Sequence, residues 1–153
     1  MSELDKSDID ILRHLQQDGR LSNASLASRI ALSETPCWRR LRKMEENGYI
    51  TDYQANIDRR KLGFGVMAFV QLSCTEHDEA STLKFEQAIE QSPNVLACHN
   101  TTGESDFILQ VVARDLDDYS HFIEQVLRKL PGISAIRSNI SLREIKASSR
   151  LPI

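Results

Sequence analysis

Apolar residues recur at helical spacing over the first part of the chain. The spacing predicts a helix over residues 5–18, which Gly19 ends, and a shorter helix over residues 22–30. A tight connection leads to a third helix over residues 33–48. The loose alternation of residues 49–57 then predicts a small two-stranded wing. This order of elements is the pattern of a winged helix-turn-helix.

The pattern changes near residue 60. The elements predicted after it are a strand over 66–75, a helix over 82–91, strands over 95–101 and 106–113, a helix over 116–130 and a strand over 133–145. The segment also repeats itself, since FVQLS and FEQAIEQSPNVLA resemble the later FILQVV and FIEQVLRKLPGISA. Two such units give the βαββαβ order of a ferredoxin-like fold, with two helices on one face of an antiparallel sheet.

These patterns predict an α+β protein of two domains. Residues 1–57 form the winged helix-turn-helix, residues 58–65 (DRRKLGFG) the linker, and residues 66–153 the βαββαβ domain. The second face of the sheet needs a cover that so small a domain does not supply. A second copy of the chain is the simplest cover, so we expect a homodimer through this domain.

Composition excludes several other classes. The chain has 153 residues, of which 41% are hydrophobic and 27% charged, as in soluble globular proteins. No apolar run is long enough to span a membrane, and the start MSELDKSDID is unlike a signal peptide. We therefore expect a cytoplasmic protein.

Cysteines and histidines give no metal or disulfide pattern. Cys37, Cys74 and Cys98 are odd in number, widely spaced and without a C-x-x-C pair. The histidines show no metal-ligand spacing with cysteines or acids; they are His14, His77, His99 and His121. We expect no metal and no cofactor.

Positive charge is concentrated in the stretch SETPCWRRLRKMEENG. The net charge is −3, yet residues 39–43 hold four bases and no acid. Local charge, rather than total charge, decides where a phosphate backbone docks. Three interpretations compete: a helix that reads nucleic acid, a Cys37 thiol activated by the cations, and an ordinary solvated helix face.

A helical wheel separates these interpretations. Cys37, Leu41 and Met44 share one face, and most of the cations lie roughly opposite. A catalytic thiolate needs exposure and a partner base, so the wheel argues against a reactive Cys37. Most isolated charge runs are solvated surface, but this one lies on the second helix of a helix-turn-helix, the element that enters the major groove. We therefore predict DNA recognition.

Position along this helix assigns the contacts. The predicted DNA-binding residues are Ser33, Glu34, Thr35, Trp38, Arg39, Arg40, Arg42 and Lys43. Those near the helix start reach base edges, whereas Arg40, Arg42 and Lys43 more often meet phosphates. Arg39 bidentate to a guanine is the best-defined specific contact. Glu34 repels phosphate, so it approaches DNA at a base edge such as a cytosine amino group.

A second candidate site is the stretch TTGESDF at residues 101–107. A glycine beside two carboxylates and three hydroxyls at a strand junction offers N–H donors and anionic partners to a small polar molecule. By composition alone, a simple hairpin turn is the commoner interpretation. Nothing in the pattern supports an acid/base pair of Glu104 and Asp106.

Taken in order, these pieces resemble the Lrp/AsnC (feast/famine) transcription regulators over nearly the whole chain. The matching pieces are LDKSDIDILRHLQQDGRLSNASLASRIALSETPCWRRLRKMEENGYI, the strand after GFG, the TGESDF turn, LPGI and the tail EIKASSRLPI. The resemblance implies a winged helix-turn-helix joined to a RAM/ACT-like ligand-sensing domain, with double-stranded DNA as partner. It also implies dimers able to assemble into octamers, and an amino acid or related metabolite bound between dimers.

The resemblance also implies effector-binding residues. Carried over by position, these are Thr102, Gly103, Glu104, Ser105 and Asp106, with Ser138 and Ile140 on the facing strand. Glu34 departs from the proline or small residue frequent there in the family, which leaves operator preference open. The effector does not carry over, because family members differ in it.

Two other classes of protein compete with a transcription regulator. A metabolic enzyme, or its regulatory subunit, would bind an amino acid in the ferredoxin-like domain, but the sequence shows no catalytic constellation. RNA recognition modules share the βαββαβ order but stack bases on aromatic residues of their central strands. Here residues 95–101 have none and residues 106–113 have only Phe107. We therefore expect a DNA-binding regulator, not an enzyme.

Overall fold

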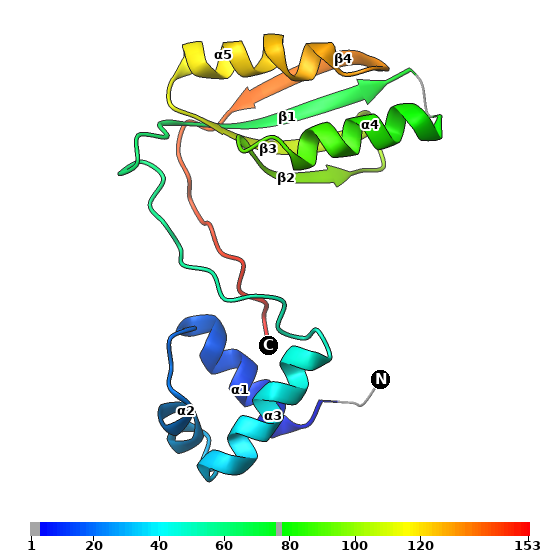
Figure 1. The fold of residues 1–153 in the computed structure, drawn as a ribbon. Helices are drawn as coiled ribbons and strands as arrows, with labels where there is room; N and C mark the ends of the chain where they lie inside the picture. The colour runs from blue at the N-terminus through cyan, green and yellow to red at the C-terminus, as the bar shows by residue number, and fades with distance from the viewer. Residues whose placement is uncertain (1–3, 76–77) are drawn as a thin grey trace. The chain divides into compact units, whose positions relative to one another are not determined.

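A computed structural model describes residues 4–75 and 78–153 of the chain (Figure 1). Contacts divide these residues into two compact units. The N-terminal unit contains the described residues up to Asn56 together with Lys146–Ile153, and the C-terminal unit contains Ile57–Ile145. The final eight residues therefore belong with the N-terminal unit, whereas the sequence pattern had grouped them with the βαββαβ domain.

Three helices make up most of the N-terminal unit. They are α1 (Lys6–Gln17), α2 (Asn23–Arg29) and α3 (Glu34–Glu46), close to the predicted ranges. Asp5 begins α1 with a capping box, in which its carboxylate accepts from the Asp8 N–H and the Asp8 carboxylate accepts from the Asp5 N–H. Ser22 caps α2 with a single bond, in which its hydroxyl accepts from the Ser25 N–H.

Apolar side chains from all three helices meet in one small core. Its buried members are Ile11, Leu26, Ala27, Cys37 and Met44. With the partly buried Leu15, Ile30 and Leu41, the apolar residues of each helix recur three to four positions apart, so each helix turns one stripe inward and its polar face outward. The helical part of the prediction is confirmed.

The predicted two-stranded wing is not formed as strands. Residues 51–57 run without strand pairing in the described structure. A side chain holds this segment instead, since the Tyr53 hydroxyl donates to the Glu45 carboxylate at 2.9 Å. Burial, and secondarily the bond to Glu45, raises the pKa of Tyr53 to about 12.

The C-terminal unit is a βαββαβ fold with one sheet. Its elements are β1 (Val66–Cys74), α4 (Glu79–Glu90), β2 (Val95–Asn100), β3 (Phe107–Ala113), α5 (Leu116–Gln125), the short 3₁₀ helix η1 (Leu127–Lys129) and β4 (Ile133–Ile140). The described strands lie in the order β2-β3-β1-β4, and every neighbouring pair is antiparallel. This is the predicted ferredoxin-like topology. The final strand ends at Ile140 rather than at residue 145, and the last helix gives way to η1.

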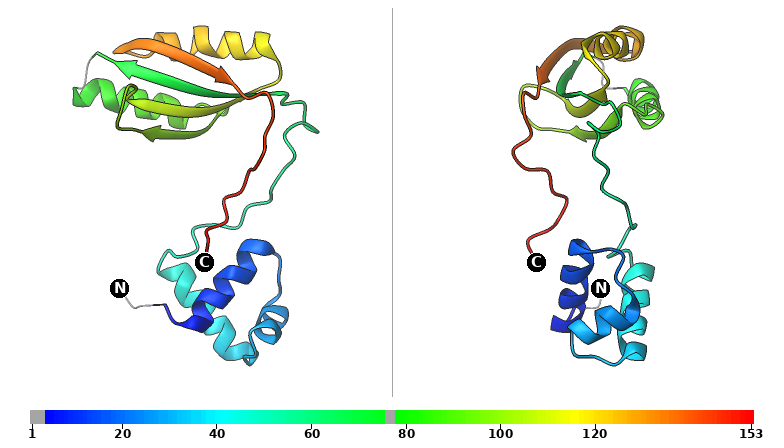
Figure 2. Two further views of the ribbon diagram at one scale, coloured as in Figure 1. Left: turned by 180° about the vertical axis from the view of Figure 1, so that it is seen from behind. Right: turned by 90° about the vertical axis from the view of Figure 1, so that its left-hand side faces the viewer.

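Helices α4 and α5 both lie on one face of the sheet (Figure 2). The buried residues between the layers are Ala68, Val70, Leu72, Phe85, Ile89, Leu109, Val111, Ala113, Tyr119, Phe122 and Leu127. The other face has no covering layer in the described residues, and Phe69 there is 43% exposed. Successive residues of β1 therefore point alternately to the helix-covered face and to the uncovered face of the sheet.

In the described residues, no helix has both the length and the apolar character needed to cross a bilayer.

Candidate DNA-binding and ligand-binding sites

The core side of α3 determines how this helix presents its surface. Cys37 and Met44 are buried in the core of the N-terminal unit, and burial raises the pKa of the Cys37 thiol. A buried thiol with a raised pKa is a poor nucleophile, so the expectation that Cys37 packs inward is confirmed. The Asn23 side chain also donates to the Glu34 carbonyl at 2.9 Å, which ties the start of α2 to the start of α3.

The opposite side of α3 carries exposed cations. Arg39 and Lys43 are exposed, and neither forms an ion pair or a side-chain hydrogen bond within the described part of the chain. Trp38 beside them is 52% exposed. The guanidinium of Arg42 lies 5.7 Å from the centre of the Trp38 ring and pairs with Glu45 at 3.2 Å. Arg42 is therefore positioned by an aromatic face and an acid, whereas Arg39 and Lys43 are free to meet a ligand.

Arg40 points instead to the start of α1. Its guanidinium lies 2.7 Å from the Asp5 carboxylate and 2.8 Å from that of Asp8. The hydrogen bonds that Arg40 donates to Asp8 and Asp5 raise the pKa of Arg40, and the pKa of Asp5 is lowered by the Asp8 N–H and by Arg40. A phosphate would have to compete with two carboxylates for this side chain. In the structure, Arg40 joins α3 to the cap of α1.

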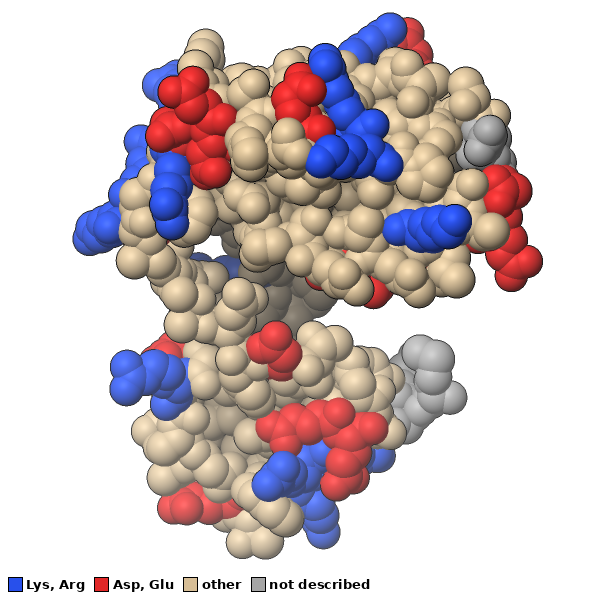
Figure 3. Space-filling model, turned by 45° about the horizontal axis from the view of Figure 1, so that its top comes forward, with Lys and Arg blue, Asp and Glu red and all other residues tan. Residues whose placement is uncertain are grey.

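Ser33, Glu34 and Thr35 lie together at the exposed start of α3. Ser33 is the N-cap residue by backbone conformation, but its side chain makes no capping hydrogen bond. Its hydroxyl is therefore available to an outside partner. Acidic and basic side chains lie next to one another on the face drawn in Figure 3, in both units.

The turn between β2 and β3 contains the second candidate site. The Thr101 N–H donates to the Asp106 carbonyl at 2.9 Å, and the Thr101 hydroxyl donates to the Ser105 carbonyl at 2.9 Å. Gly103 has a φ of 134°, a backbone conformation that residues other than glycine rarely adopt. The turn is therefore closed by its own hydrogen bonds, around a position that requires glycine.

Backbone donors remain free at the tip of this turn. The N–H groups of residues 102–105 donate to no other group within the described residues. The exposed Glu104 pairs with Arg137 of β4 at 3.4 Å, with the Glu104 side chain 91% exposed. So exposed a pair contributes little to stability. The tip thus offers several N–H donors beside one cation, a combination suited to an anion such as a carboxylate.

Asp106 is used to fix the turn onto β1. Its carboxylate accepts from the Cys74 N–H at 2.7 Å, and its own N–H donates to the Leu72 carbonyl at 2.9 Å. Burial, with a smaller effect from the Asp106 charge, raises the pKa of the Cys74 thiol. Asp106 therefore positions the turn in the single chain.

The two predicted β4 residues lie away from the turn. Ser138 pairs with Val70, and Ile140 with Ala68, both nearer the start of β1 than the Leu72 that Asp106 contacts. The Tyr119 hydroxyl donates to Ser138 at 2.5 Å. The structure therefore brings residues 102–106 together but does not bring Ser138 and Ile140 to them within one chain.

A small cavity beside the turn was not predicted from the sequence. It has a volume of about 120 Å³ and is lined by Cys74, Ser81, Thr82, Phe85, Asn100, Phe107 and Pro131. The only signal for this cavity in the sequence is that two of its lining residues, Asn100 and Phe107, flank the turn. Small-molecule sites usually measure about 300–1,000 Å³. Among the described residues, the cavity at this end of the sheet is therefore smaller than a pocket of ordinary ligand size.

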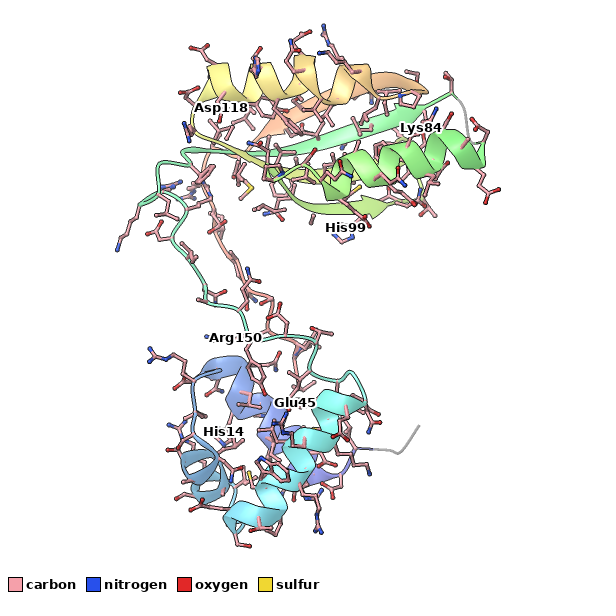
Figure 4. All side chains as sticks on the ribbon, in the orientation of Figure 1. His14, Glu45, Lys84, His99, Asp118 and Arg150 are labelled. Atoms are coloured by element: carbon pink, nitrogen blue, oxygen red, sulfur yellow. The ribbon has the colours of Figure 1, made fainter. Side chains whose placement is uncertain are left out.

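Within residues 4–75 and 78–153, no cluster of three or more His, Cys, Asp or Glu side chains is arranged to hold a metal. His14 and His99, labelled in Figure 4, come from different units, α1 and β2. His121 is exposed on α5. His77 lies outside the described residues.

Comparison with known proteins assigns both units. Residues 4–51 match the profile of a winged helix-turn-helix DNA-binding domain, and residues 67–151 match that of the Lrp/AsnC ligand binding domain. The Bkd operon transcriptional regulator of Pseudomonas aeruginosa is 38% identical over 153 residues, with all of both chains covered. The chain belongs to the Lrp/AsnC family. It is therefore a DNA-binding transcription regulator with a ligand-binding domain.

Other members of the Lrp/AsnC family extend the comparison. The DNA-binding transcriptional activator DecR of Escherichia coli is 34% identical over 150 residues, covering 98% of this chain and 99% of DecR. The crystal structure of a transcriptional regulator from Neisseria meningitidis in complex with L-Met has a TM-score of 0.93 and 37% identity. The match covers 98% of this chain and 97% of the Neisseria chain. All three are named as transcription regulators, and none is named as an enzyme or an RNA-binding protein.

Proposed function

We propose that this Lrp/AsnC regulator reads a specific duplex DNA site through α3, under the control of an amino acid or a closely related metabolite. The observation that supports the DNA part most directly is the pair of partner-free cations, Arg39 and Lys43, on the exposed side of α3. The opposite side of the same helix is buried in the core. A rigid helix with one anchored side and one free basic side suits the major groove.

Within this proposal the residues of α3 fall into groups according to which part of the DNA each can reach. Arg39 contacts a guanine edge, with Ser33, Glu34, Thr35 and Trp38 beside it at the start of the helix. Lys43 and Arg42 meet phosphates, Arg42 in the orientation that Trp38 imposes. Arg40 acts mainly through its two carboxylate partners, by holding α1 against α3.

The ligand part rests on the turn between β2 and β3. A free amino acid carries a carboxylate, and the unoccupied N–H groups of residues 102–105 are donors of the kind that capture carboxylates. The L-Met complex of the Neisseria relative supports an amino acid as the ligand class. In this proposal Glu104 exchanges its contact with Arg137 for the ligand's ammonium group, and Asp106 keeps the turn in position.

We further propose that the ligand site is completed by another copy of the chain. The cavity of about 120 Å³ beside the turn is too small for an ordinary ligand site. The open sheet face, with the half-exposed Phe69, favours a dimer, and further assembly into octamers would bring Ser138 and Ile140 of other copies toward the turn. In this proposal the protein acts in the cytoplasm, uses no cofactor and catalyses no reaction.

One experiment tests both parts of the proposal. Fluorescence anisotropy would measure binding to duplex DNA from upstream of the protein's own gene and to scrambled DNA, at two salt concentrations, with and without each amino acid. We expect selective binding that one amino acid or a small group of them shifts, because a ligand changes an equilibrium only through different affinities for its states. Equal affinity for both duplexes under every condition would contradict sequence-specific recognition.

A further inference from the structure

The end of the chain is bound to α1 by backbone recognition. The side-chain amide of Gln16 donates to the Leu151 carbonyl at 3.3 Å and accepts from the Leu151 N–H at 2.5 Å. The Arg13 guanidinium donates to the Ile153 carbonyl at 3.0 Å. Two side chains one turn apart on α1 thus hold an extended segment through its backbone, as a neighbouring strand would.

The segment lies along a groove within the N-terminal unit and forms one wall of it. Its cavity measures about 460 Å³ and is lined by Leu12, Leu15, Gln16, Gln17, Gly19, residues 49–54, Asn56, residues 149–151 and Ile153. Leu151 remains 67% exposed and Ile153 39% exposed. The segment is therefore held by exposed hydrogen bonds more than by apolar burial, and such bonds exchange readily with water.

The position of this segment in the chain makes it a second connection between the two units. It follows β4, which pairs with β1 in the sheet of the ligand-binding domain. Residues 57–65 already connect the two units once, and residues 141–146 lead the chain back to the N-terminal unit. At the start of α1, Arg40 then joins the Asp5 and Asp8 carboxylates to α3. A continuous series of contacts runs from the end of the chain through α1 to the recognition helix.

We propose that the groove on α1 is a docking site for the chain's own C-terminal segment, residues 146–153, and that docking reversibly restrains the DNA-binding unit. The inference rests on the proposed function, because it concerns how the ligand-binding domain reaches the DNA-binding helices. With the segment docked, each DNA-binding unit has two connections to its ligand-binding domain. The second connection reduces the orientations that the unit samples, which favours DNA with two half-sites at one spacing.

Amide hydrogen exchange measured by NMR on the full chain tests the docking itself. In the wild-type protein the Leu151 amide should be protected, and Gln16→Ala should speed its exchange about tenfold or more, since the bond to Gln16 is lost. Gln87→Ala on α4 is the matched control, because Gln87 is exposed, lies outside the groove and makes no side-chain hydrogen bond within the described residues. An unprotected Leu151 amide in the wild-type protein, or unchanged exchange in Gln16→Ala, would overturn the docking. Protection that depends on protein concentration would show that the segment comes from another copy, and would overturn the intramolecular form.

DNA binding tests the consequence of docking. On a duplex with two half-sites, Gln16→Ala should weaken binding about tenfold, and on a duplex with one half-site less than twofold, since only the first requires two units at one spacing. Leu151→Pro removes the same N–H donor without a change in α1 and should reproduce both results. Equal losses on both duplexes, or none, would refute the restraint.

Arg39→Ala separates this inference from the proposed function. It should weaken binding to both duplexes while the Leu151 amide stays protected. If the wild-type protein discriminates neither duplex from scrambled DNA, sequence-specific recognition and the proposed consequence both fail. The docking is then still decided by amide exchange alone.

Discussion

The two candidate sites are built in different ways. On α3, the groups proposed to bind are side chains projecting from a helix whose other side is buried, so the site is complete in one chain. In the turn between β2 and β3, they are backbone N–H groups around Gly103, and one chain encloses little volume beside them. A site made of side chains on a helix is visible in residue spacing. A site made of backbone groups depends on the assembly around it.

The same contrast appears among the cations of α3 itself. Arg39 and Lys43 have no partner in the described residues, whereas Arg40 binds two carboxylates and Arg42 lies beside Trp38 and Glu45. Four neighbouring bases therefore have at least two roles. Adjacent positions on a helix point about 100° apart, so one element presents some bases to solvent and others to its neighbours.

Arg39→Ala should give the largest effect and test the side-chain site directly. We expect a loss of about 1–3 kcal/mol on the specific duplex and relaxed preference at one base pair, because a bidentate contact to a base is removed. Anisotropy titrations over single-base variants of the duplex measure both. A uniform loss over all sequences would mean that Arg39 contacts phosphate only.

Gly103→Val should give the next largest effect and test the backbone site. A β-branched residue at a φ of 134° is strained, at a cost of about 1–3 kcal/mol, and relaxation of the turn would misplace its N–H groups. We expect weaker ligand response, measured as the shift of DNA affinity on adding the amino acid, with unchanged affinity for DNA without ligand. Gly63→Val, also at positive φ but in the connecting segment, is the control for strain alone.

Arg40→Ala should affect the stability of the N-terminal unit more than it affects the affinity for DNA. Its partners are partly exposed, so solvent screening limits the loss to about 1 kcal/mol of unfolding free energy for the N-terminal unit. Urea unfolding followed through Trp38 fluorescence measures it. A salt slope of DNA binding reduced by about one, with no change in stability, would instead place Arg40 on a phosphate.

Lys43→Ala should have a smaller effect that does not depend on sequence. Removal of one phosphate contact lowers the slope of log affinity against log salt by about one and weakens all duplexes alike. Titrations at several salt concentrations with specific and scrambled DNA measure this slope. Loss confined to the specific duplex would move Lys43 to the base-reading group.

Acid should produce the smallest and most local effect, at the cap of α1. The Asp8 N–H and Arg40 hold the pKa of Asp5 below its ordinary value of 3.8, so the folded chain favours the ionised carboxylate. This contribution is complete above the ordinary value and is lost as the pH falls through the lowered folded value. In unfolding experiments, Asp5→Asn should differ from the wild-type protein near neutral pH and converge with it in strong acid. A constant difference at all pH values would exclude the carboxylate charge as the cause.

The sequence by itself determined the order of elements and the inner face of each helix. Apolar residues recur at helical spacing within a helix, as Cys37, Leu41 and Met44 do on α3, and such a stripe selects the buried face. The duplicated strand-helix-strand pattern likewise determined the βαββαβ fold, because each strand needs a helix-covered apolar face. The glycine of the turn was visible too, since a positive φ has a residue preference of its own.

Only the tertiary structure decided which polar groups already have partners. Arg40 meets Asp5 and Asp8 across more than 30 positions of sequence. Gln16 meets Leu151 across 135 positions, and residues 51–57 remain without a partner strand. Spacing along one helix or strand carries no information about such pairs, because they depend on where the chain returns. Local periodicity therefore determined which surfaces exist, and long-range contact determined which of their groups remain free to bind.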